Sequence, residues 1–440
     1  MITIVVFTIF VIAYALIMQG KYPRSVVAFA AGILILLLKV SPELTVGSVG
    51  EYVDFNTIGL LIGMMIIVGV LKSTGFFEFI TAWIVKLSKG RMLRITLLML
   101  VASALLSSIL DNVTTILVFA PIVFLIADSI QINPTPLILA LLFSANIGGT
   151  STILGDPPNL LIGSAANAGF IQFSSVMLWP TLIVLAIYTL YFRKKNAALA
   201  QIPSEKLERL LSIDPSKAIT DRKLFKQSLI VFGFVILGFL LHSVFEYEPS
   251  LIALFGAIII LILSKRDFHS ISTEIEWETI FFFLGLFAVT RALKDVGITG
   301  AVATAISRMQ VPPVFVVLTV LWVSGLLGGI IGAVPITTVF IPIVQSLQGT
   351  IPHSYELWWA LALGTGLGGS TTFSGAAANM VAVGLIEKNY KGKVKRTNSF
   401  SLSFVGGCMS FFIPYVDSSI KKSTLGIPFL TGFIVLTSEP

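Results

Sequence analysis

The sequence predicts an all-α protein that crosses a membrane many times, built as two inverted repeats of five transmembrane helices. Three observations predict it: the chain carries few charges, its apolar segments have the length of membrane spans, and its two halves share motifs in the same order. Of its 440 residues, 56% are hydrophobic and 12% are charged. A soluble domain carries about 25% charged residues. A water-soluble enzyme, a disordered chain, a coiled coil and a nucleic-acid-binding protein are therefore excluded, despite a formal net charge of +7.

The apolar segments approach the roughly 20 residues that a membrane-spanning helix needs. The first has no basic region before it, so we expect a retained span rather than a cleaved signal peptide. Two stretches, 74–91 and 297–311, are too short or too charged to cross and are expected to lie at the interface as arms. The predicted spans are 2–18, 24–41, 57–72, 92–109, 113–127, 136–169, 175–192, 226–244, 249–264, 279–293, 313–331, 337–348, 357–387 and 400–416.

Three blocks of the first half recur in the second half, in the same order and at nearly one spacing. Motifs within Thr57–Gly75 match Thr279–Gly297 at an offset of 222, and Asp111–Pro121 matches Gly332–Pro342 without gaps at 221. The third block, Gly148–Asn159 against Gly368–Asn379, has an offset of 220. Chance matches of apolar residues do not produce such an ordered set. The chain is therefore predicted to be an internal duplication.

The distribution of basic residues between the two sides of the membrane indicates that the repeats are inverted. If 92–127 dips into the membrane and returns, each half has an odd number of crossings. Most of the 29 basic residues then fall on the cytoplasmic side, as the positive-inside rule requires, with both termini outside. The first repeat is predicted at 1–192, with its hairpin at 92–127 and its broken helix at 136–169. A cytoplasmic linker follows at 193–225, with a surface helix at 204–211, and the second repeat is predicted at 226–416, with its hairpin at 313–348 and its broken helix at 357–387. The C-terminal tail is 417–440, in which 424–437 is too short for an assured span.

The candidate site lies where polar residues break the apolar runs. Backbone can leave the helix at membrane depth only where it is buried in protein or lines a cavity, and transporters with inverted repeats bind their cargo at such breaks. The breaks here are 111–115, 148–159, 332–338 and 368–379. A carboxylate between apolar runs is costly and indicates function. We expect Asp111 or Asn112 to cap the helix after the first break, and Asp156 to cap the helix after the second, with Pro157 in its first turn. Both carboxylates are expected to take part in the site.

The two halves of this site differ in charge. Gly332, Ala333 and Ala376 replace Asp111, Asn112 and Asp156, so both carboxylates lie in the first half. Carboxylates near neutral oxygens suit H⁺ or Na⁺ as the coupling ion. Apart from Na⁺ at Asp111, Asn112 and Asp156, no metal and no cofactor is expected. The candidate ligands of ion or solute are Asp111, Asn112, Thr114, Thr115, Gly149, Thr150, Thr152, Asp156, Asn159, Thr337, Gly369, Thr371, Thr372 and Asn379.

Several classes of mechanism are disfavoured. Cys408 is the only cysteine and the three histidines lie far apart, so a metal cofactor is not expected. Because the sequence has no phosphate-binding loop, transport would be driven by a gradient or be passive. A passive channel would not need duplicated hairpins. An intramembrane enzyme would have only Asp111 and Asp156 as its catalytic pair, so we predict that the chain is not an enzyme.

At Leu110–Thr115 and Gly148–Asn159 the sequence resembles the ion transporter superfamily. It is most similar to the branch of the arsenite-efflux permeases and the melanosomal P protein, and less similar to sodium/proton antiporters and divalent-anion/sodium symporters. The resemblance implies a scaffold domain that dimerises, a transport domain and elevator-like alternating access. By position it implies that Asn112, Thr114 and Asn159 form the first-half site, with Thr372 and Asn379 in the second. Members often carry Asn-Asn where this chain has Gly332-Ala333, which weakens the case for a second cation site.

The function expected from sequence is ion-coupled secondary transport of a small inorganic ion or solute. Proton-coupled efflux of arsenite or antimonite is favoured by the resemblance alone. A Na⁺/H⁺ antiporter is the near rival, because the two acidic residues would suffice. A Na⁺- or H⁺-coupled symporter of carboxylates or oxyanions comes third, because few basic residues reach the inferred site. The expected setting is a prokaryotic inner (cytoplasmic) membrane, with the lipid bilayer and a second copy of the chain as partners and no nucleic acid.

Overall fold

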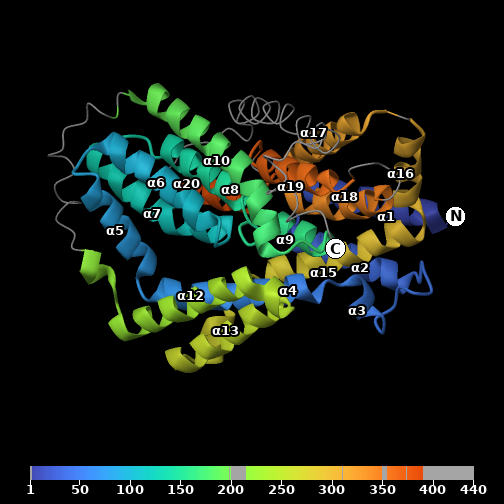
Figure 1. Cartoon of the computed structure of the whole chain (residues 1–440), viewed down its shortest axis with the longest axis horizontal. Helices are drawn as coiled ribbons and strands as arrows, with labels where there is room; N and C mark the ends of the chain where they lie inside the picture. Colours follow the sequence, from blue (N-terminus) through green and yellow to red (C-terminus); the bar gives the residue numbers. More distant parts are fainter. Residues whose placement is uncertain are drawn as a thin grey trace.

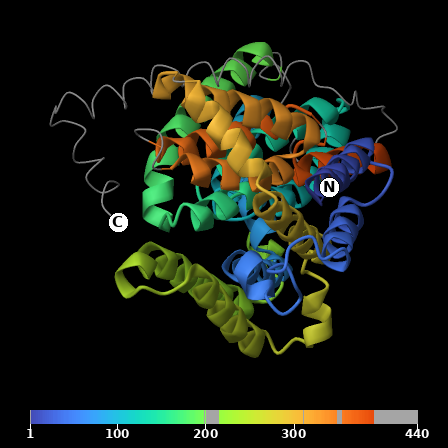
Figure 2. The same ribbon diagram turned by 90° about the vertical axis from the view of Figure 1, so that its right-hand side faces the viewer.

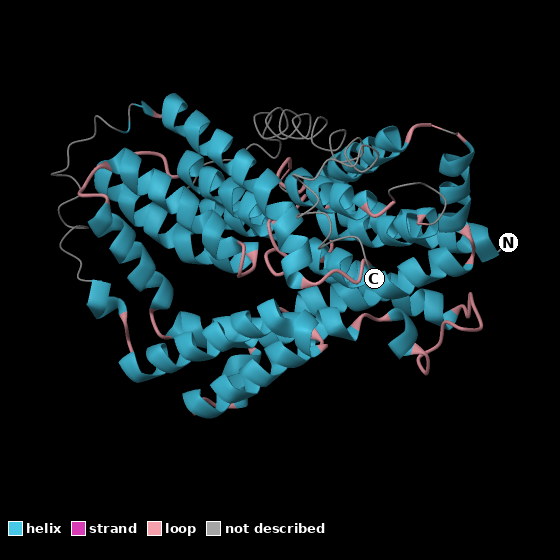
Figure 3. Ribbon diagram, viewed as in Figure 1, coloured by secondary structure: helices cyan, strands magenta, loops and turns pink. Residues whose placement is uncertain are grey.

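The computed structural model describes residues 2–197, 199, 215–309, 311–348, 354–372 and 374–389. Helices and the loops between them make up this part of the chain, with no strand among the described residues (Figure 3). The predicted span 400–416, the tail 417–440 and the surface helix 204–211 lie outside it. Helices α10 and α12 take 193–195 and 222–225 from the predicted linker.

One layer of the molecule is formed by long helices that run side by side along its longest axis (Figures 1 and 2). Helix α2 packs along α15, and α4 packs along α13, which also contacts α12. Small residues allow these close approaches: a Cβ placed on Gly63 of α4 would lie 2.8 Å from Ala253 Cβ of α13. The elements of this layer are α1 (Ile2–Gln19), α2 (Arg24–Leu37), α3 (Val49–Tyr52), α4 (Phe55–Ser73), η3 (Pro215–Ala218), α12 (Arg222–Phe245), α13 (Pro249–Ser264), α14 (Phe268–Ser272) and α15 (Trp277–Asp295).

The second layer holds the hairpins and the broken helices. The α6–α7 and α17–α18 hairpins lie toward opposite ends of the molecule, as inverted repeats predict (Figure 1). Each hairpin packs its first helix on the first half of its own broken helix, α6 on α8 and α17 on α19. The helices are α6 (Met92–Ser107), α7 (Asn112–Ile130), α8 (Thr135–Gly149), α9 (Pro157–Ala165), α10 (Phe170–Lys195), α17 (Pro313–Ile331), α18 (Ala333–Leu347), α19 (Glu356–Gly368) and α20 (Ala377–Asn389).

Six described helices are long and apolar enough to cross a membrane. The predicted spans coincide with helices throughout the described residues, and both predicted breaks at 148–159 and 368–379 interrupt a helix. The ends differ from prediction by a few residues, because capping and tertiary contacts rather than hydropathy set where a helix stops. The six are α1, α4, α7, α10, α12 and α17.

Two short helices connect the layers at opposite ends of the molecule (Figure 1). They are the predicted arms, α5 (Phe76–Leu87) and α16 (Ile298–Arg308). Each follows a glycine with a left-handed backbone, Gly75 at φ +84° and Gly297 at φ +79°. These two glycines occupy equivalent positions in the repeats. We call the bend that each makes an elbow: Gly75 between α4 and α5, and Gly297 between α15 and α16.

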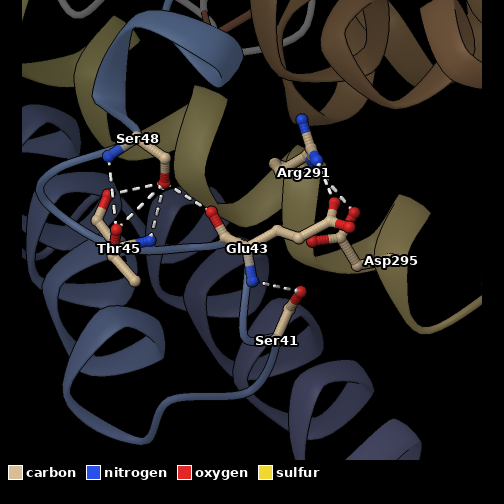
Figure 4. A network of polar contacts seen from close by, with 6 residues as sticks. All are labelled: Ser41, Glu43, Thr45, Ser48, Arg291 and Asp295. Carbon is tan, nitrogen blue, oxygen red and sulfur yellow. Dashed lines mark hydrogen bonds and ion pairs between the residues drawn. The ribbon is translucent and has the colours of Figure 1, made fainter.

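Ion pairs link the helix end before each elbow to a loop of the other half. Lys72 Nζ at the end of α4 lies 3.5 Å from Glu274 Oε2, in the loop before α15. Reciprocally, Arg291 Nη2 near the end of α15 lies 2.8 Å from Glu43 Oε2, in the loop between α2 and α3, and Arg291 Nε donates to Asp295 Oδ1 at 2.7 Å (Figure 4). The end of α4 therefore lies near the start of α15, and the end of α15 lies near the loop that precedes α3.

Substitution of the elbow glycines is expected to destabilise the two halves unequally. Alanine at a positive φ costs about 1 kcal/mol, which is the effect expected for Gly297→Ala, where a Cβ would meet open space. In Gly75→Ala the new Cβ would also lie 2.9 Å from the carbonyl carbon of Ala218. Thermal unfolding in detergent should therefore show a larger loss for Gly75→Ala. Equal losses would mean that residue 218 does not hold the first elbow.

The inverted arrangement predicts that the arms are reached from opposite sides of the membrane. Lys86→Cys in α5 should react with an impermeant maleimide from the cytoplasmic side, and Arg308→Cys in α16 from the outside. Both side chains are exposed in the structure. A Cys408→Ser background removes the one native thiol. Labelling of both cysteines from one side would rule out the inverted topology.

Candidate ion and solute site

The four predicted breaks are brought together in the second layer. Helices α8 and α9 of the first half contact α19 of the second half, α9 contacts α18, and α20 contacts both α7 and α8. The tip of each hairpin therefore lies beside the loop of its own broken helix, and the two loops adjoin each other. Residues far apart in sequence thus share one region of the fold.

The first hairpin tip is stabilised by Asp111. Its Oδ1 accepts from Thr114 N at 2.7 Å and its Oδ2 from Thr114 Oγ1 at 2.6 Å. Thr115 Oγ1 donates to the Asp111 carbonyl at 3.0 Å. The predicted cap of α7 is thus confirmed, and the half-buried carboxylate has one orientation at the tip.

Asn112 attaches this tip to the loop of the broken helix. It is 4% exposed. Its amide nitrogen donates to the Gly155 carbonyl at 3.1 Å, to the Ala145 carbonyl at 3.3 Å and to the Ser107 hydroxyl. Gly149 has no side chain and so provides the space for this amide. A Cβ at this position would lie 2.7 Å from Gly155 O and overlap the Asn112 amide.

Asp156 does not cap α9 as predicted. It occupies the N-cap position, but its side chain accepts no capping hydrogen bond. The physical reason is that Pro157 and Pro158 have no N–H at the first two helical positions, while Asn159 N donates to the Asp156 carbonyl at 3.0 Å. The carboxylate, 8% exposed, faces the Asn112 side chain and lies within electrostatic range of Asp111. Neither carboxylate forms an ion pair within the described residues.

Two asparagines close the loops in the same way. Asn159 Nδ2 donates to the carbonyls of Gly149, Thr150 and Thr152 at 3.1, 3.1 and 2.9 Å. Asn379 Nδ2 donates to those of Gly369 and Thr372 at 2.7 and 2.6 Å. The hydroxyls of Thr152 and Thr372 donate to the last turns of the hairpins' first helices, at Ser108 and Gly329. Equivalent bonds at equivalent positions are what an internal duplication requires.

The second half lacks the polar tip of the first. Gly332, at φ +122°, precedes Ala333, whose N–H donates directly to the Gly375 carbonyl at 2.9 Å. Backbone therefore replaces the Asn112 side chain in this contact. Tyr14 of α1 donates from its hydroxyl to the Pro335 carbonyl at 2.9 Å, which joins this tip to the other layer.

The remaining predicted ligands donate their hydroxyl hydrogens to backbone. Thr150 Oγ1 donates to Asn146 O at 2.8 Å, Thr337 Oγ1 to Ala333 O at 2.9 Å, and Thr371 Oγ1 to Gly368 O at 2.8 Å. A solute can use their remaining acceptor capacity or exchange these bonds. Two buried polar atoms of the loops have no partner within the described residues, Asn159 Oδ1 and Ser370 Oγ.

Sequence reasoning missed two groups of polar residues near the site. Asn146 and Ser107 lie inside helical runs, where the only signal was a polar residue one turn or less before a break. A charged group, Arg24 with Glu276 and Glu278, lies on the other layer, and Glu276 is within electrostatic range of Asp111. Its members come from distant segments, so no local pattern joins them. No cluster of His, Cys, Asp and Glu suited to a metal ion occurs among the described residues.

Comparisons with known proteins identify relatives over most of the chain. The model of the citrate transporter family (CitMHS) matches residues 14–364. An uncharacterised transporter of Mycobacterium tuberculosis is 35% identical over 395 residues, covering 88% of this chain and 91% of the relative. A 46 kDa membrane protein of Mycobacterium leprae is 36% identical over 388 residues, covering 86% and 90%.

Two further comparisons bear on the predicted resemblance and on the fold. The mouse P protein is 30% identical over 447 residues, covering 83% of this chain and 53% of the P protein. The crystal structure of the Alcanivorax borkumensis YdaH transporter has a TM-score of 0.59 at 14% identity, covering 90% of this chain and 99% of that one. The predicted resemblance is confirmed by the first, and the all-helical transporter fold by the second.

Proposed function

This chain belongs to the citrate transporter family, and we propose that it is a cation-coupled secondary transporter whose cargo is a small carboxylate. One observation carries the proposal: Asp156 and Asp111 lie close together where a hairpin tip meets a broken helix, without a basic partner among the described residues. Carboxylates at membrane depth are costly unless a cation or proton neutralises them. We therefore assign them the coupling H⁺ or Na⁺.

The order of binding follows from charge. An anionic cargo is repelled by Asp111 and Asp156 until the coupling cation has bound, so uptake of one favours uptake of the other. The cargo would be held by neutral groups of the two loops and by the start of α20, because free N–H groups at helix starts attract anions. The start of α9 offers none, since Pro157 and Pro158 have no N–H. The cation therefore sets the affinity for the cargo, which is the requirement for coupled transport.

A second candidate is proton-coupled efflux of arsenite or antimonite, which the sequence resemblance favours. One observation supports it: among the described residues, no Lys or Arg side chain forms a hydrogen bond with either loop. A neutral hydroxide such as arsenious acid needs no cationic partner. The elevator-type movement and the homodimer that the resemblance implies stay part of this proposal, with the arms α5 and α16 joining the moving layer to the fixed one.

The test uses purified protein in liposomes that contain a pH-sensitive dye and carry an imposed proton gradient. Citrate, arsenite or antimonite, and Na⁺ or Li⁺ are added in turn, with protein-free liposomes as the blank. Proton movement that depends on citrate supports the proposal. A response to the metalloid alone would select the second candidate, and a response to Na⁺ or Li⁺ alone would make the chain a cation/proton antiporter. For Na⁺-driven symport, uptake of radiolabelled citrate under a Na⁺ gradient replaces the dye.

A further inference from the structure

We infer that Asn146 is a positioning residue that links the cation-binding half of the site to the other half. Its side chain is 1% exposed and lies in the last turns of α8. Its Nδ2 donates to Asn379 Oδ1 in the second half at 3.0 Å. Its Oδ1 lies 3.2 Å from the amide of Asn112 at the first hairpin tip. One side chain thus touches both a residue that faces Asp156 and the residue that closes the second loop.

This link exists in one direction only. The repeat equivalent of Asn146 is Gly366, and a Cβ there would lie 2.7 Å from Thr150 Cγ2. A side chain that could reach Asn159 as Asn146 reaches Asn379 is therefore absent. The Asn379 amide is fully paired, whereas Asn159 Oδ1 is buried and has no partner within the described residues.

The asymmetry separates the tasks of the two asparagines. Buried acceptors are almost always paired, so the open oxygen of Asn159, one helical turn after Asp156, is suited to a cation. The Asn379 side-chain oxygen is already paired, and Asn379 contacts the first half through its hydrogen bond with Asn146. A change at Asn112 on cation binding is thereby passed to the loop that Asn379 closes. The inference rests on the proposed function, since it assigns the cation to the first half of that site.

The experiment measures cation binding with and without citrate in purified wild type, Asn146→Leu and a matched control. Leucine has as many side-chain heavy atoms as asparagine but cannot make the hydrogen bond to Asn379. The control is Ser144→Ala, which removes a buried hydroxyl of the same helix that donates to Leu100 O at 2.6 Å, away from both loops. Intrinsic fluorescence is titrated with Na⁺ at fixed pH and with acid at fixed Na⁺, and the citrate KM is measured across the same series.

In the wild type and in Ser144→Ala, the citrate KM should fall as the cation binds. In Asn146→Leu that dependence should shrink by about tenfold, within the usual range of coupling between sites, while the cation titration itself is retained. A citrate KM that still follows the cation as in the wild type would overturn the inference and leave the proposed function intact. A wild type that binds no cation, or does not respond to citrate, would instead count against the proposed function.

If Asn146→Leu does not give monodisperse protein, Asn146→Ser takes its place, since its short side chain cannot span the distance to Asn379. A second arm uses the same readout in a double-mutant cycle. Asn379→Leu should weaken the dependence of the citrate KM on the cation when Asn146 is present and have no further effect on it in the Asn146→Leu background. Additive effects of the two substitutions would show that the side chains act independently and would overturn the link.

Discussion

Asp156→Asn is expected to lower the rate of cation-coupled transport by at least about 100-fold, while the protein still folds. Loss of a residue that only supports an ion ligand usually costs about 10- to 100-fold, and we assign Asp156 to the cation itself. The carboxylate lies at the meeting point of the hairpin tip and the broken helix, where it is 8% exposed and faces Asn112. Its removal leaves no negative charge on the loop. Because the side chain accepts no capping hydrogen bond, an isosteric amide takes nothing from α9.

The measurement is cation-driven flux in liposomes beside thermal unfolding of the same preparation. Asp156→Glu serves as the companion variant, because it retains the charge and shifts its position. Partial flux in Asp156→Glu with none in Asp156→Asn would show that the charge is what matters. Wild-type flux in Asp156→Asn would remove Asp156 from the mechanism and with it the main support for the proposed cation site.

Asp111→Ala is expected to lose both a helix cap and transport, and the chain contains a matched control for the cap alone. Asp54 caps α4 as Asp111 caps α7: its Oδ1 accepts from Thr57 N at 3.0 Å and its Oδ2 from Thr57 Oγ1 at 2.6 Å. Loss of an N-cap costs about 1 kcal/mol, so Asp111→Ala and Asp54→Ala should be destabilised alike. Only Asp111→Ala should also lose flux, by about tenfold or more as expected for a lost coupling.

Asp111→Asn separates the two roles further, since asparagine caps helices as well as aspartate does. This variant should keep most of its stability and still lose cation-dependent flux. Stability is followed by thermal unfolding in detergent, and flux by the dye assay. Equal flux losses in Asp111→Ala and Asp54→Ala would mean that stability alone explains the effect, and that Asp111 has a structural role only.

Helix positions and the duplication could be predicted because they rest on local pattern. A run of apolar residues must be helical in a membrane, since its backbone finds no water to bind. A cap such as Asp111 on Thr114 depends on three residues of chain and is visible in sequence. The same reasoning failed for Asp156, because Pro157 and Pro158 remove the N–H groups that a capping carboxylate would bind.

By itself, then, the sequence determined that this is a membrane protein of two related halves, where its helices are broken, and that both carboxylates of the site lie in the first half. Only the tertiary structure decided what those breaks contact. The hydrogen bond from Asn146 to Asn379 joins residues 233 positions apart, and Asn159 Oδ1 is left open because Gly366 has no side chain to reach it. Such pairings depend on how two layers of helices pack, which no local pattern of residues encodes.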